Sequence, residues 1–399
     1  MLQFRKIRIS LRGKVKKDEK LIFANGIVKI NRFSKLNLIE LFIFNNLVYR
    51  RININGKKIR HFFKFSSVPD EKNKTNSNEY NIDSIEKKLN SYENKVCSKI
   101  IEELSDIDFD DAYIYKHHIG EIYLYLNLLD EYIKANGSKK PVVVINEKRY
   151  IDFYLLYGKD RIYRYIDLVP SELDSIGSSD MVEYEGHRIF NPTPDRFENF
   201  RKLISSGEDV NFYSYIKSSL HIKNDKIKFK NPEFSNSLVK SANEKLSNIN
   251  LNKDNFVFLF PEAITATQLR PIFWKTIAER IKQKNIDILI NLTKEDFHYA
   301  GIKTTNLSLA EAIYVSSRAK CIIALISGLV VSLSTLKIPK ILLYTQQTPT
   351  IGYRMSSEEM LKTYSIKNIT PIDYQLIREI DADKLSEEDL IETVLELVK

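Results

Sequence analysis

Residues 255–290 read NFVFLFPEAITATQLRPIFWKTIAERIKQKNIDILI, and this stretch decides the fold. It contains two short apolar runs, Phe256–Phe260 and Asp287–Ile290, that do not alternate with polar residues, as is typical of strands buried on both faces. Between them, Pro271 can occupy the first turn of a helix, where a missing N–H costs nothing. The stretch therefore predicts a strand–helix–strand unit of a parallel sheet.

The same alternation continues further along the chain. A Ser-x-x-Glu capping box begins at Ser308 and predicts the start of another helix. Apolar runs at Cys321–Leu325 and Lys340–Tyr344 predict two more buried strands, and Ser327-Gly328 joins the first of these to a helix. We therefore expect a nucleotide-sized α/β half in this part of the chain.

An earlier part of the sequence shows a similar pattern. Strand-like runs at Ala112–Tyr115 and Pro141–Ile145 enclose a helical segment that ends near Ala135. A loop-rich segment, 170–194, and a polar crossing segment, 223–252, follow and lead to the second half. The sequence therefore predicts an α/β protein with two Rossmann-like domains that face a cleft.

We predict three parts: residues 1–90, a basic N-terminal segment with a polar linker, and two domains at 91–250 and 251–399. Turn signals between strand-like runs make the first part β-rich or mixed. Its apolar run Leu36–Val48 is too short to span a bilayer, so it could lie in a membrane interface or pack as a core helix.

The composition is that of an ordinary soluble protein: 399 residues, 43% hydrophobic and 28% charged. We find no secretory segment and no apolar run that could span a membrane, so we expect a protein in the cytoplasm or at the inner face of the membrane. Cys97 and Cys321 are far apart, which argues against a disulfide framework or a zinc site.

The positive charge is concentrated at the N-terminus. Residues 1–64 hold seventeen Lys or Arg and three Asp or Glu, a balance of +14, so the rest of the chain carries −5 of the total of +9. A basic surface with interspersed Phe suits an anionic membrane or a diphosphate lipid. It would also suit nucleic acid, or be a solvated face; we predict membrane contact through residues 1–64 and no nucleic-acid partner.

Two groups of motifs resemble known sugar-transferring enzymes. His118-Ile119-Gly120-Glu121, followed by an apolar helix and then Lys139-Lys140-Pro141-Val142-Val143-Val144, resembles the entry motif of heptosyltransferases. Later motifs resemble the second half of glycosyltransferases from capsule and lipopolysaccharide loci: Phe260-Pro261-Glu262-Ala263, Phe273-Trp274, Asn291 and Ser327-Gly328-Leu329. Enzymes of this kind have two Rossmann domains, the arrangement called GT-B, and the resemblance covers about residues 110 to 345.

The resemblance implies a glycosyltransferase that moves a sugar from a nucleotide-sugar donor to a hydroxyl of a surface polysaccharide, a lipid-linked glycan or a glycoprotein. It implies that residues 91–250 bind the acceptor and residues 251–399 bind the donor. Helix N-termini and basic side chains would stabilise the departing nucleotide, so we expect no metal and no cofactor. The triplet Asp108-Phe109-Asp110 resembles the Asp-x-Asp metal site of the other large glycosyltransferase architecture. It comes before a strand, however, whereas such a metal site is expected after one.

The candidate catalytic residues lie at the start of the first helix. Glu121 is our candidate base, and the alternative is a first-turn carboxylate stabilised by the helix dipole. His118 could take the base role, could bind the acceptor, or could do neither. The candidate donor-binding residues are Glu262, Thr265, Arg270, Ser327, Gly328 and Leu329.

The chain departs from the family pattern at two positions. Ile326 stands where related enzymes often have Arg, and Glu121 stands where they usually have Asp. An Arg at the first position would offer a cation to the donor diphosphate. Its absence leaves open that another residue such as Arg270, Lys275 or Arg354 supplies the charge. It also leaves open a non-catalytic GT-B-like partner or scaffold of a glycosylation complex.

Overall fold

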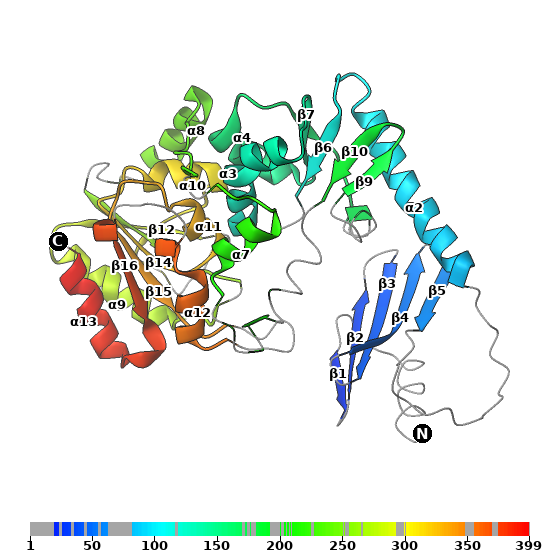
Figure 1. Cartoon of the computed structure of the whole chain (residues 1–399). Helices are drawn as coiled ribbons and strands as arrows, with labels where there is room; N and C mark the ends of the chain where they lie inside the picture. The colour runs from blue at the N-terminus through cyan, green and yellow to red at the C-terminus, as the bar shows by residue number, and fades with distance from the viewer. Residues whose placement is uncertain are drawn as a thin grey trace. The chain divides into compact units, whose positions relative to one another are not determined.

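A computed structural model describes residues 20–23, 26–32, 36–43, 46–54, 57–62, 82–115, 119–169, 172–173, 176, 181–191, 200, 203–204, 206, 208, 210–224, 227–249, 251, 255–264, 266–292, 299, 301–347, 355–368 and 374–398. The chain divides into two compact units, Met1–Ser98 and Lys99–Lys399 (Figure 1). Each unit is described by itself.

The first unit contains a five-stranded antiparallel sheet in which each strand pairs with the next along the chain. Its strands are β1 (Lys20–Phe23), β2 (Gly26–Arg32), β3 (Leu36–Ile43), β4 (Asn46–Ile54) and β5 (Lys57–Phe62). The β-rich prediction for the N-terminal segment is confirmed.

One expectation for this unit is wrong: the apolar run 36–48 is not a helix. It forms β3 and the beginning of β4. These two strands are antiparallel, and Ile43 of β3 lies opposite Asn46 of β4. Its β-branched and aromatic residues favour strands.

Helix α2 (Ile82–Glu103) crosses the division between the units. It begins inside the segment that we expected to be a polar linker. Ile82, Ile85 and Leu89 recur at helical spacing among polar residues, which is the pattern that accounts for the helix.

The second unit begins with a mixed sheet of five strands in the order β8-β7-β6-β10-β9. The strands are β6 (Asp111–Ile114), β7 (Pro141–Ile145), β8 (Tyr163–Tyr165), β9 (Met181–Tyr184) and β10 (His187–Phe190). All neighbours are parallel except β9 and β10. The connecting helices are α3 (Ile119–Ala135) and α4 (Ile151–Gly158), and α7 (Phe212–Ser219) follows the sheet. The predicted strands at Ala112–Tyr115 and Pro141–Ile145 and the helix that ends near Ala135 are confirmed.

The hairpin β9–β10 lies in the segment 170–194 that we expected to be loop-rich. Glu185 and Gly186, which join its strands, both have positive φ, as a two-residue hairpin turn requires. Because Glu is uncommon at positive φ, this turn is hard to predict from the sequence. β10 then pairs with β6 and extends the sheet.

The second sheet of this unit has six parallel strands in the order β13-β12-β11-β14-β15-β16. They are β11 (Phe256–Phe260), β12 (Asp287–Asn291), β13 (Lys303–Thr305), β14 (Cys321–Leu325), β15 (Lys340–Tyr344) and β16 (Ile377–Asp381). The four central strands match the prediction. The two edge strands, β13 and β16, were missed because both are short and carry polar residues.

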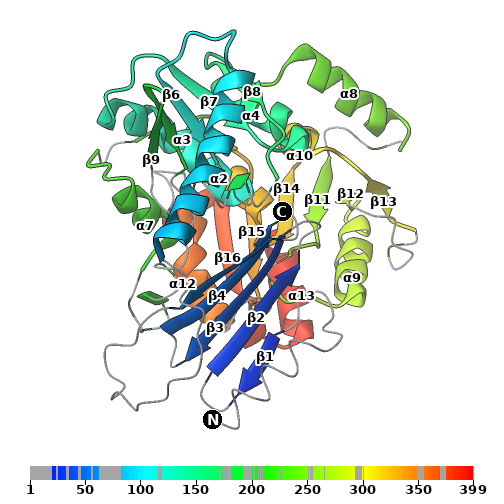
Figure 2. The same cartoon turned by 90° about the vertical axis from the view of Figure 1, so that its right-hand side faces the viewer.

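The helices of this half are α8 (Asn236–Ser247), α9 (Pro271–Lys282), α10 (Leu309–Ser316), α11 (Gly328–Ser332), α12 (Ser357–Tyr364) and α13 (Glu387–Leu397). They include helices that the sequence predicts, such as α9 and α10, and helices that it does not, such as α8. Helix α9 starts at its proline and lies beside β12 (Figure 2), and α10 has the predicted capping box. The predicted inner face of α9 is buried: Phe273, Trp274, Ile277, Ala278 and Ile281.

The strand order places β11 and β14 side by side although β12 and β13 lie between them in sequence. Strands β12 and β13 extend the sheet on one side of β11, and β14, β15 and β16 then extend it on the other side. The carboxyl ends of two such central strands form the usual ligand edge of an open α/β sheet. The amino ends form the opposite edge.

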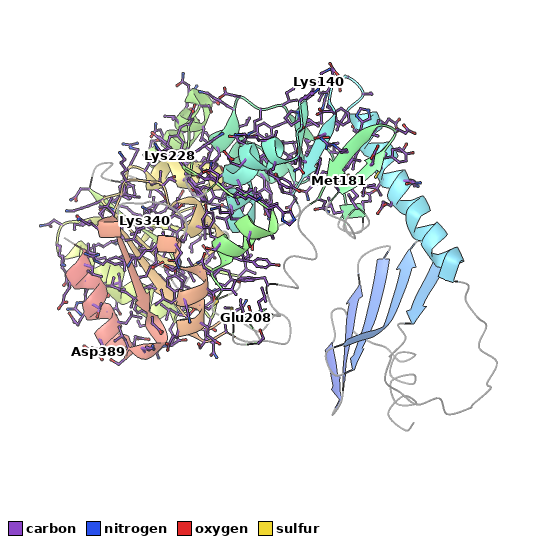
Figure 3. The ribbon with its side chains drawn as sticks, in the orientation of Figure 1. Lys140, Met181, Glu208, Lys228, Lys340 and Asp389 are labelled. Atoms are coloured by element: carbon purple, nitrogen blue, oxygen red, sulfur yellow. The ribbon has the colours of Figure 1, made fainter. Side chains whose placement is uncertain are left out.

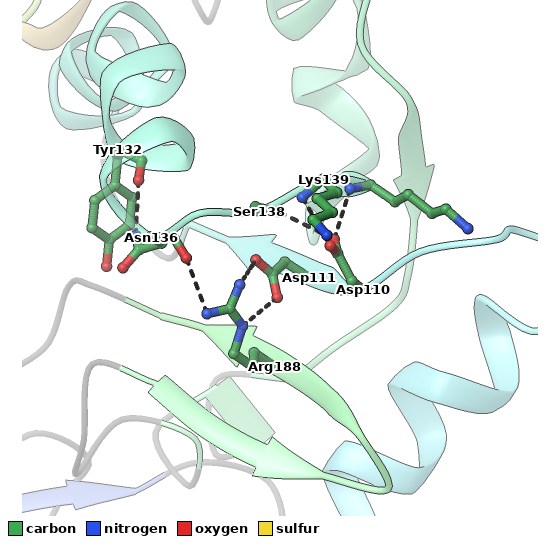
Figure 4. Close-up of polar contacts among 8 residues, drawn as sticks. Asp110, Asp111, Tyr132, Asn136, Ser138, Lys139 and Arg188 are labelled. Carbon is green, nitrogen blue, oxygen red and sulfur yellow. Dashed lines mark hydrogen bonds and ion pairs between the residues drawn. The ribbon is translucent and has the colours of Figure 1, made fainter.

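At the amino ends of the first sheet, a buried carboxylate is paired with an arginine (Figure 4). Arg188 Nε and Nη2 donate to the two oxygens of Asp111, at 2.7 and 2.5 Å, and Nη1 donates to the carbonyl of Asn136 at 3.1 Å. Asp111 is completely buried, while the arginine side chain is 33% exposed. The pair therefore joins β6 to β10.

The neighbouring Asp110 accepts hydrogen bonds from the backbone of Lys139 and Lys140, each at 2.8 Å. Burial raises the pKa of the Asp110 carboxyl, but these hydrogen bonds outweigh it, so the pKa lies below its ordinary value. Asp108 pairs with the side chain of Lys140, which Figure 3 labels. The Asp108-Phe109-Asp110 triplet thus has a structural role at the amino edge.

Lys340 lies at the amino end of β15 and is 1% exposed (Figure 3). Its ammonium donates to the carbonyls of Leu336 and Ile338, at 2.5 and 3.0 Å. Burial lowers the pKa of Lys340 to about 8. These contacts also belong to the edge of the sheet that faces away from the ligand edge.

We predict that Arg188→Met destabilises the second unit by about 3 kcal/mol, because it leaves the buried Asp111 carboxylate without its cation. Urea unfolding followed by circular dichroism measures the change. Lys140→Met, which removes the exposed partner of Asp108, is the matched control and should cost less than about 1 kcal/mol. Equal effects of the two substitutions would contradict this account of the Arg188–Asp111 pair.

Candidate functional site

The loops that follow the carboxyl ends of the parallel strands carry the candidate residues. Helix α3 begins shortly after β6, and Glu147 follows β7. In the other half, residues 261–270 follow β11 and Ser327 follows β14. Because the strands of each sheet are parallel, the loops of each half gather at one edge.

The first turns of α3 and α11 are in direct contact. A Cβ atom placed on Gly328 would lie 2.7 Å from the backbone nitrogen of Gly120, and one placed on Gly120 would lie 3.1 Å from the Cα atom of Gly328. Only two glycines allow this approach of the two backbones. The contact brings the carboxyl ends of the two sheets together, with Glu121 beside one glycine and Ser327 beside the other.

Buried tyrosines hold the two halves in this arrangement. The hydroxyl of Tyr123 in α3 lies 2.9 Å from the Ser334 hydroxyl, and that of Tyr157 in α4 donates to the carbonyl of Ser332 at 2.9 Å. Burial raises the pKa of Tyr123 to about 12 and that of Tyr157 well above its ordinary value. One hydrophobic cluster runs through both halves, so they share a core.

The polar crossing segment also fastens the halves. The backbone of Lys230 donates to the Asn127 side chain at 2.7 Å, and the backbone of Glu233 donates to the carbonyl of Leu156 at 2.8 Å. The segment then forms α8, which the sequence did not predict and which lies beside α10 (Figures 1 and 2).

Glu311 anchors α8. It is 3% exposed and accepts from the Lys245 ammonium at 2.6 Å and from the Ser241 hydroxyl at 2.7 Å. The same carboxylate caps its own helix through the backbone of Ser308. Burial alone would raise the pKa of the Glu311 carboxyl, but the hydrogen bonds hold it below the ordinary value.

Of the two predicted catalytic residues, one lies within the described residues. Glu121 is in the first turn of α3 and is half-buried, at the junction of the two halves. His118 lies outside the described residues. The role of either residue remains a prediction.

Three residues near Glu121 were not predicted: Glu147, Arg149 and Tyr150, which lie in and before a short 3-10 helix, η1 (Lys148–Tyr150). Arg149 Nε and Nη2 donate to the same Glu147 oxygen, at 2.7 and 2.6 Å. The guanidinium carbon lies 4.6 Å from the centre of the Tyr150 ring. A charged run directly after a buried strand was the sequence signal that could have identified them.

The candidate donor residues around α11 are close to the junction. Ser327 is half-buried and extended, with no hydrogen bond from its side chain to the helix that follows. Gly328 begins the five-residue helix and Leu329 is half-buried within it. The predicted Ser-Gly turn into a helix is confirmed. Ile326, in the position where an Arg was discussed, is 4% exposed and belongs to the core.

The other candidate donor residues lie in the loop after β11. Glu262 is exposed, and Thr265 lies outside the described residues. Arg270 stands at the N-cap of α9 and pairs with Glu387 at 2.6 Å. This loop is attached to the one after β15, since the Thr267 backbone donates to the carbonyl of Gln346 at 2.8 Å.

Two searches of the described residues found nothing. No group of three or more His, Cys, Asp or Glu in the ranges given above could hold a metal ion. In the same part of the chain, no helix has the length and apolarity needed to cross a bilayer. Cys97 and Cys321 are both buried free thiols.

No protein-family model matches the chain, and neither does any curated protein. Among solved structures it is similar to ADP-heptose lipopolysaccharide heptosyltransferase II from E. coli, at 10% identity and a TM-score of 0.48 over 72% of this chain and 98% of that one. A glycosyl transferase family 9 protein from Veillonella parvula is similar at 13% identity and a TM-score of 0.48, over 73% of this chain and 98% of that one. E. coli heptosyltransferase WaaC with ADP is similar at 11% identity and a TM-score of 0.43, over 72% of this chain and 99% of that one.

The fold is of the GT-B type. Similarity of the degree just given carries no argument about residues, substrates or chemistry. The assignment therefore depends on the two Rossmann-like sheets and on the contact that turns their carboxyl ends toward each other. The site residues have to be argued from the chain itself.

We predict that Gly328→Ala destabilises the second unit by about 1–3 kcal/mol, because the added methyl group meets backbone that cannot move aside like a side chain. Gly120→Ala should cost less, since its nearest contact is 0.4 Å longer. Thermal unfolding of both variants measures this order. An unchanged midpoint for Gly328→Ala would show that the two helix ends are not in contact in solution.

Proposed function

We propose that this chain is a metal-independent glycosyltransferase that moves a sugar from a nucleotide-sugar donor to a hydroxyl of an acceptor glycan. The observation that carries the proposal is the contact between Gly120 and Gly328. It sets a carboxylate from one half, Glu121, beside the strand-to-helix turn of the other half. Ligands of open α/β sheets bind at such edges.

In the proposed reaction, Glu121 accepts the proton of the acceptor hydroxyl. The oxygen then forms a bond to the anomeric carbon, and the bond from that carbon to the diphosphate breaks with its electron pair, releasing a nucleoside diphosphate. Charge therefore develops on the leaving oxygen, and donors placed there accelerate the reaction. The candidates are the Ser327 hydroxyl and the backbone N–H groups of Gly328 and Leu329.

The acceptor that we propose is a surface polysaccharide, a lipid-linked glycan or a glycoprotein. The basic first unit supports an acceptor at an anionic surface, because residues 1–64 carry +14 while the rest of the chain carries −5. We propose that this unit holds the enzyme peripherally on the cytoplasmic face of a membrane.

A second candidate function is a non-catalytic GT-B-like subunit of a glycosylation complex. Two observations favour it: Ile326 is a core residue where a cation would assist the donor, and the charge of Arg270 is balanced by Glu387. Such a subunit would keep the fold and bind partners without turnover.

The decisive prediction concerns donor binding. One class among UDP, GDP, CMP and ADP, or their sugars, should raise the melting temperature of the full chain, since a ligand at a hundred times its dissociation constant adds about 2.7 kcal/mol. Ser327→Trp should abolish the shift by filling the turn. Glu121→Gln should keep the shift but lower transfer or donor hydrolysis by about 10²–10⁴-fold.

The outcomes separate the candidates. Binding without turnover, in the presence of a chelator or of added divalent cations, would support the non-catalytic subunit. Turnover that a chelator abolishes would contradict metal independence alone. A folded protein that binds none of the nucleotides would contradict the enzyme and leave the non-catalytic subunit.

Membrane contact gives a separate prediction. The full chain should co-sediment with phosphatidylglycerol vesicles at low salt and be released at high salt, because exposed charges are screened beyond about 10 Å at 0.1 M salt. Phosphatidylcholine vesicles are the control. Equal binding to the two lipids, or none to either, would count against a basic membrane-binding unit.

A further inference from the structure

The Glu147–Arg149 ion pair lies at the ligand edge of the first half. It follows β7, whose parallel neighbour β6 leads to Glu121, so both belong to the same edge of one sheet. Burial raises the pKa of the Tyr150 phenol, and the charges of Glu147 and, less strongly, of Glu121 raise it further. Tyr150, over which the Arg149 guanidinium lies, follows the same strand β7 at this edge.

The geometry of the pair keeps its polar atoms in fixed positions while leaving them accessible. Tyr150 is 8% exposed and forms a rigid base, whereas the side chains of Arg149 and Glu147 are 70% and 40% exposed. The guanidinium gives only two of its N–H groups to Glu147, both to a single oxygen, and is held over the aromatic ring. Each partner therefore retains hydrogen-bonding capacity toward solvent.

Stability gives little reason for this arrangement. An exposed ion pair contributes about 0–1 kcal/mol, so a preorganised one at a ligand edge is better explained by recognition. A fixed guanidinium beside a fixed carboxylate offers both donors and acceptors, which is what neighbouring hydroxyls of a sugar require. An aliphatic ligand would use the hydrogen-bonding capacity of neither group, and a purely anionic ligand would be repelled by the Glu147 carboxylate.

We propose that Glu147 and Arg149 form the acceptor-sugar subsite, in which they bind hydroxyls of the sugar whose reacting hydroxyl faces Glu121. Tyr150 is a positioning residue that supports the guanidinium. The inference rests on the proposed function and adds the chemistry of its second substrate. That substrate is a sugar whose hydroxyls form hydrogen bonds with the Glu147–Arg149 pair.

The test uses a glycan microarray as the probe, with the full chain and the nucleotide that raises its melting temperature. The wild-type chain should bind a subset of the glycans, and Arg149→Met and Glu147→Gln should each weaken that binding about tenfold or more, as for hydrogen bonds to charged groups. Arg149→Lys should recover little, because it keeps the charge but loses the planar fork.

The matched control is Arg280→Met, which breaks a comparably exposed pair with Glu392, far along α9 from the ligand edge. It should leave glycan binding unchanged. The Arg149 and Glu147 variants should retain the nucleotide-induced melting shift and the melting temperature of the parent, so that a loss of glycan binding reports on the subsite.

Two results would overturn the subsite: glycan binding that survives Arg149→Met at full strength, or a chain that binds the nucleotide but no glycan. Failure to bind any nucleotide would instead reject the proposed function. The two failures are therefore distinguishable.

Discussion

The close approach of Gly120 and Gly328 is the constraint on which the arrangement of the second unit depends. Two helices, α3 and α11, begin at the carboxyl ends of strands in different sheets, and their backbones touch because neither residue has a side chain. Both helices present their N-terminal ends at this point, where a carboxylate or a phosphate is favourable. A single contact thereby defines which edges of the two sheets face each other and where Glu121 lies.

The remaining contacts between the halves preserve that geometry. The tyrosine hydroxyls of α3 and α4 bind the last residue of α11 and Ser334 just after it, and Lys230 of the crossing segment is bonded to Asn127 in one half and Thr335 in the other. In contrast, the polar contacts of Asp110 and Asp111 lie at the amino ends, where they hold the sheet together. Structure and proposed chemistry therefore occupy opposite edges of the first sheet.

Much of the fold could be predicted from local patterns. The buried strands of the second sheet, the proline at the start of α9 and the capping box of α10 each depend on residues close together in sequence. The hairpin β9–β10, helix α8 and the edge strands were missed because their cause is tertiary. Helix α3 illustrates this: it is largely buried because α11, α4 and α7, which come from other parts of the sequence, all pack against it.

The candidate site could be predicted only in part. Glu121 and Ser327 were selected by motif, and the structure brings their neighbours into contact, which no spacing in the sequence could show. The pair of Glu147 and Arg149 was missed because a charged run after a strand usually means a solvated turn; the position of Arg149 over Tyr150 is a property of the folded chain.

The most direct measurement is a crystal structure of the full chain with the nucleoside diphosphate that raises its melting temperature. The account predicts the diphosphate at the turn of Ser327 and Gly328, on the side that faces Glu121. A nucleotide bound at the amino ends of the strands, or bound away from both glycines, would contradict it.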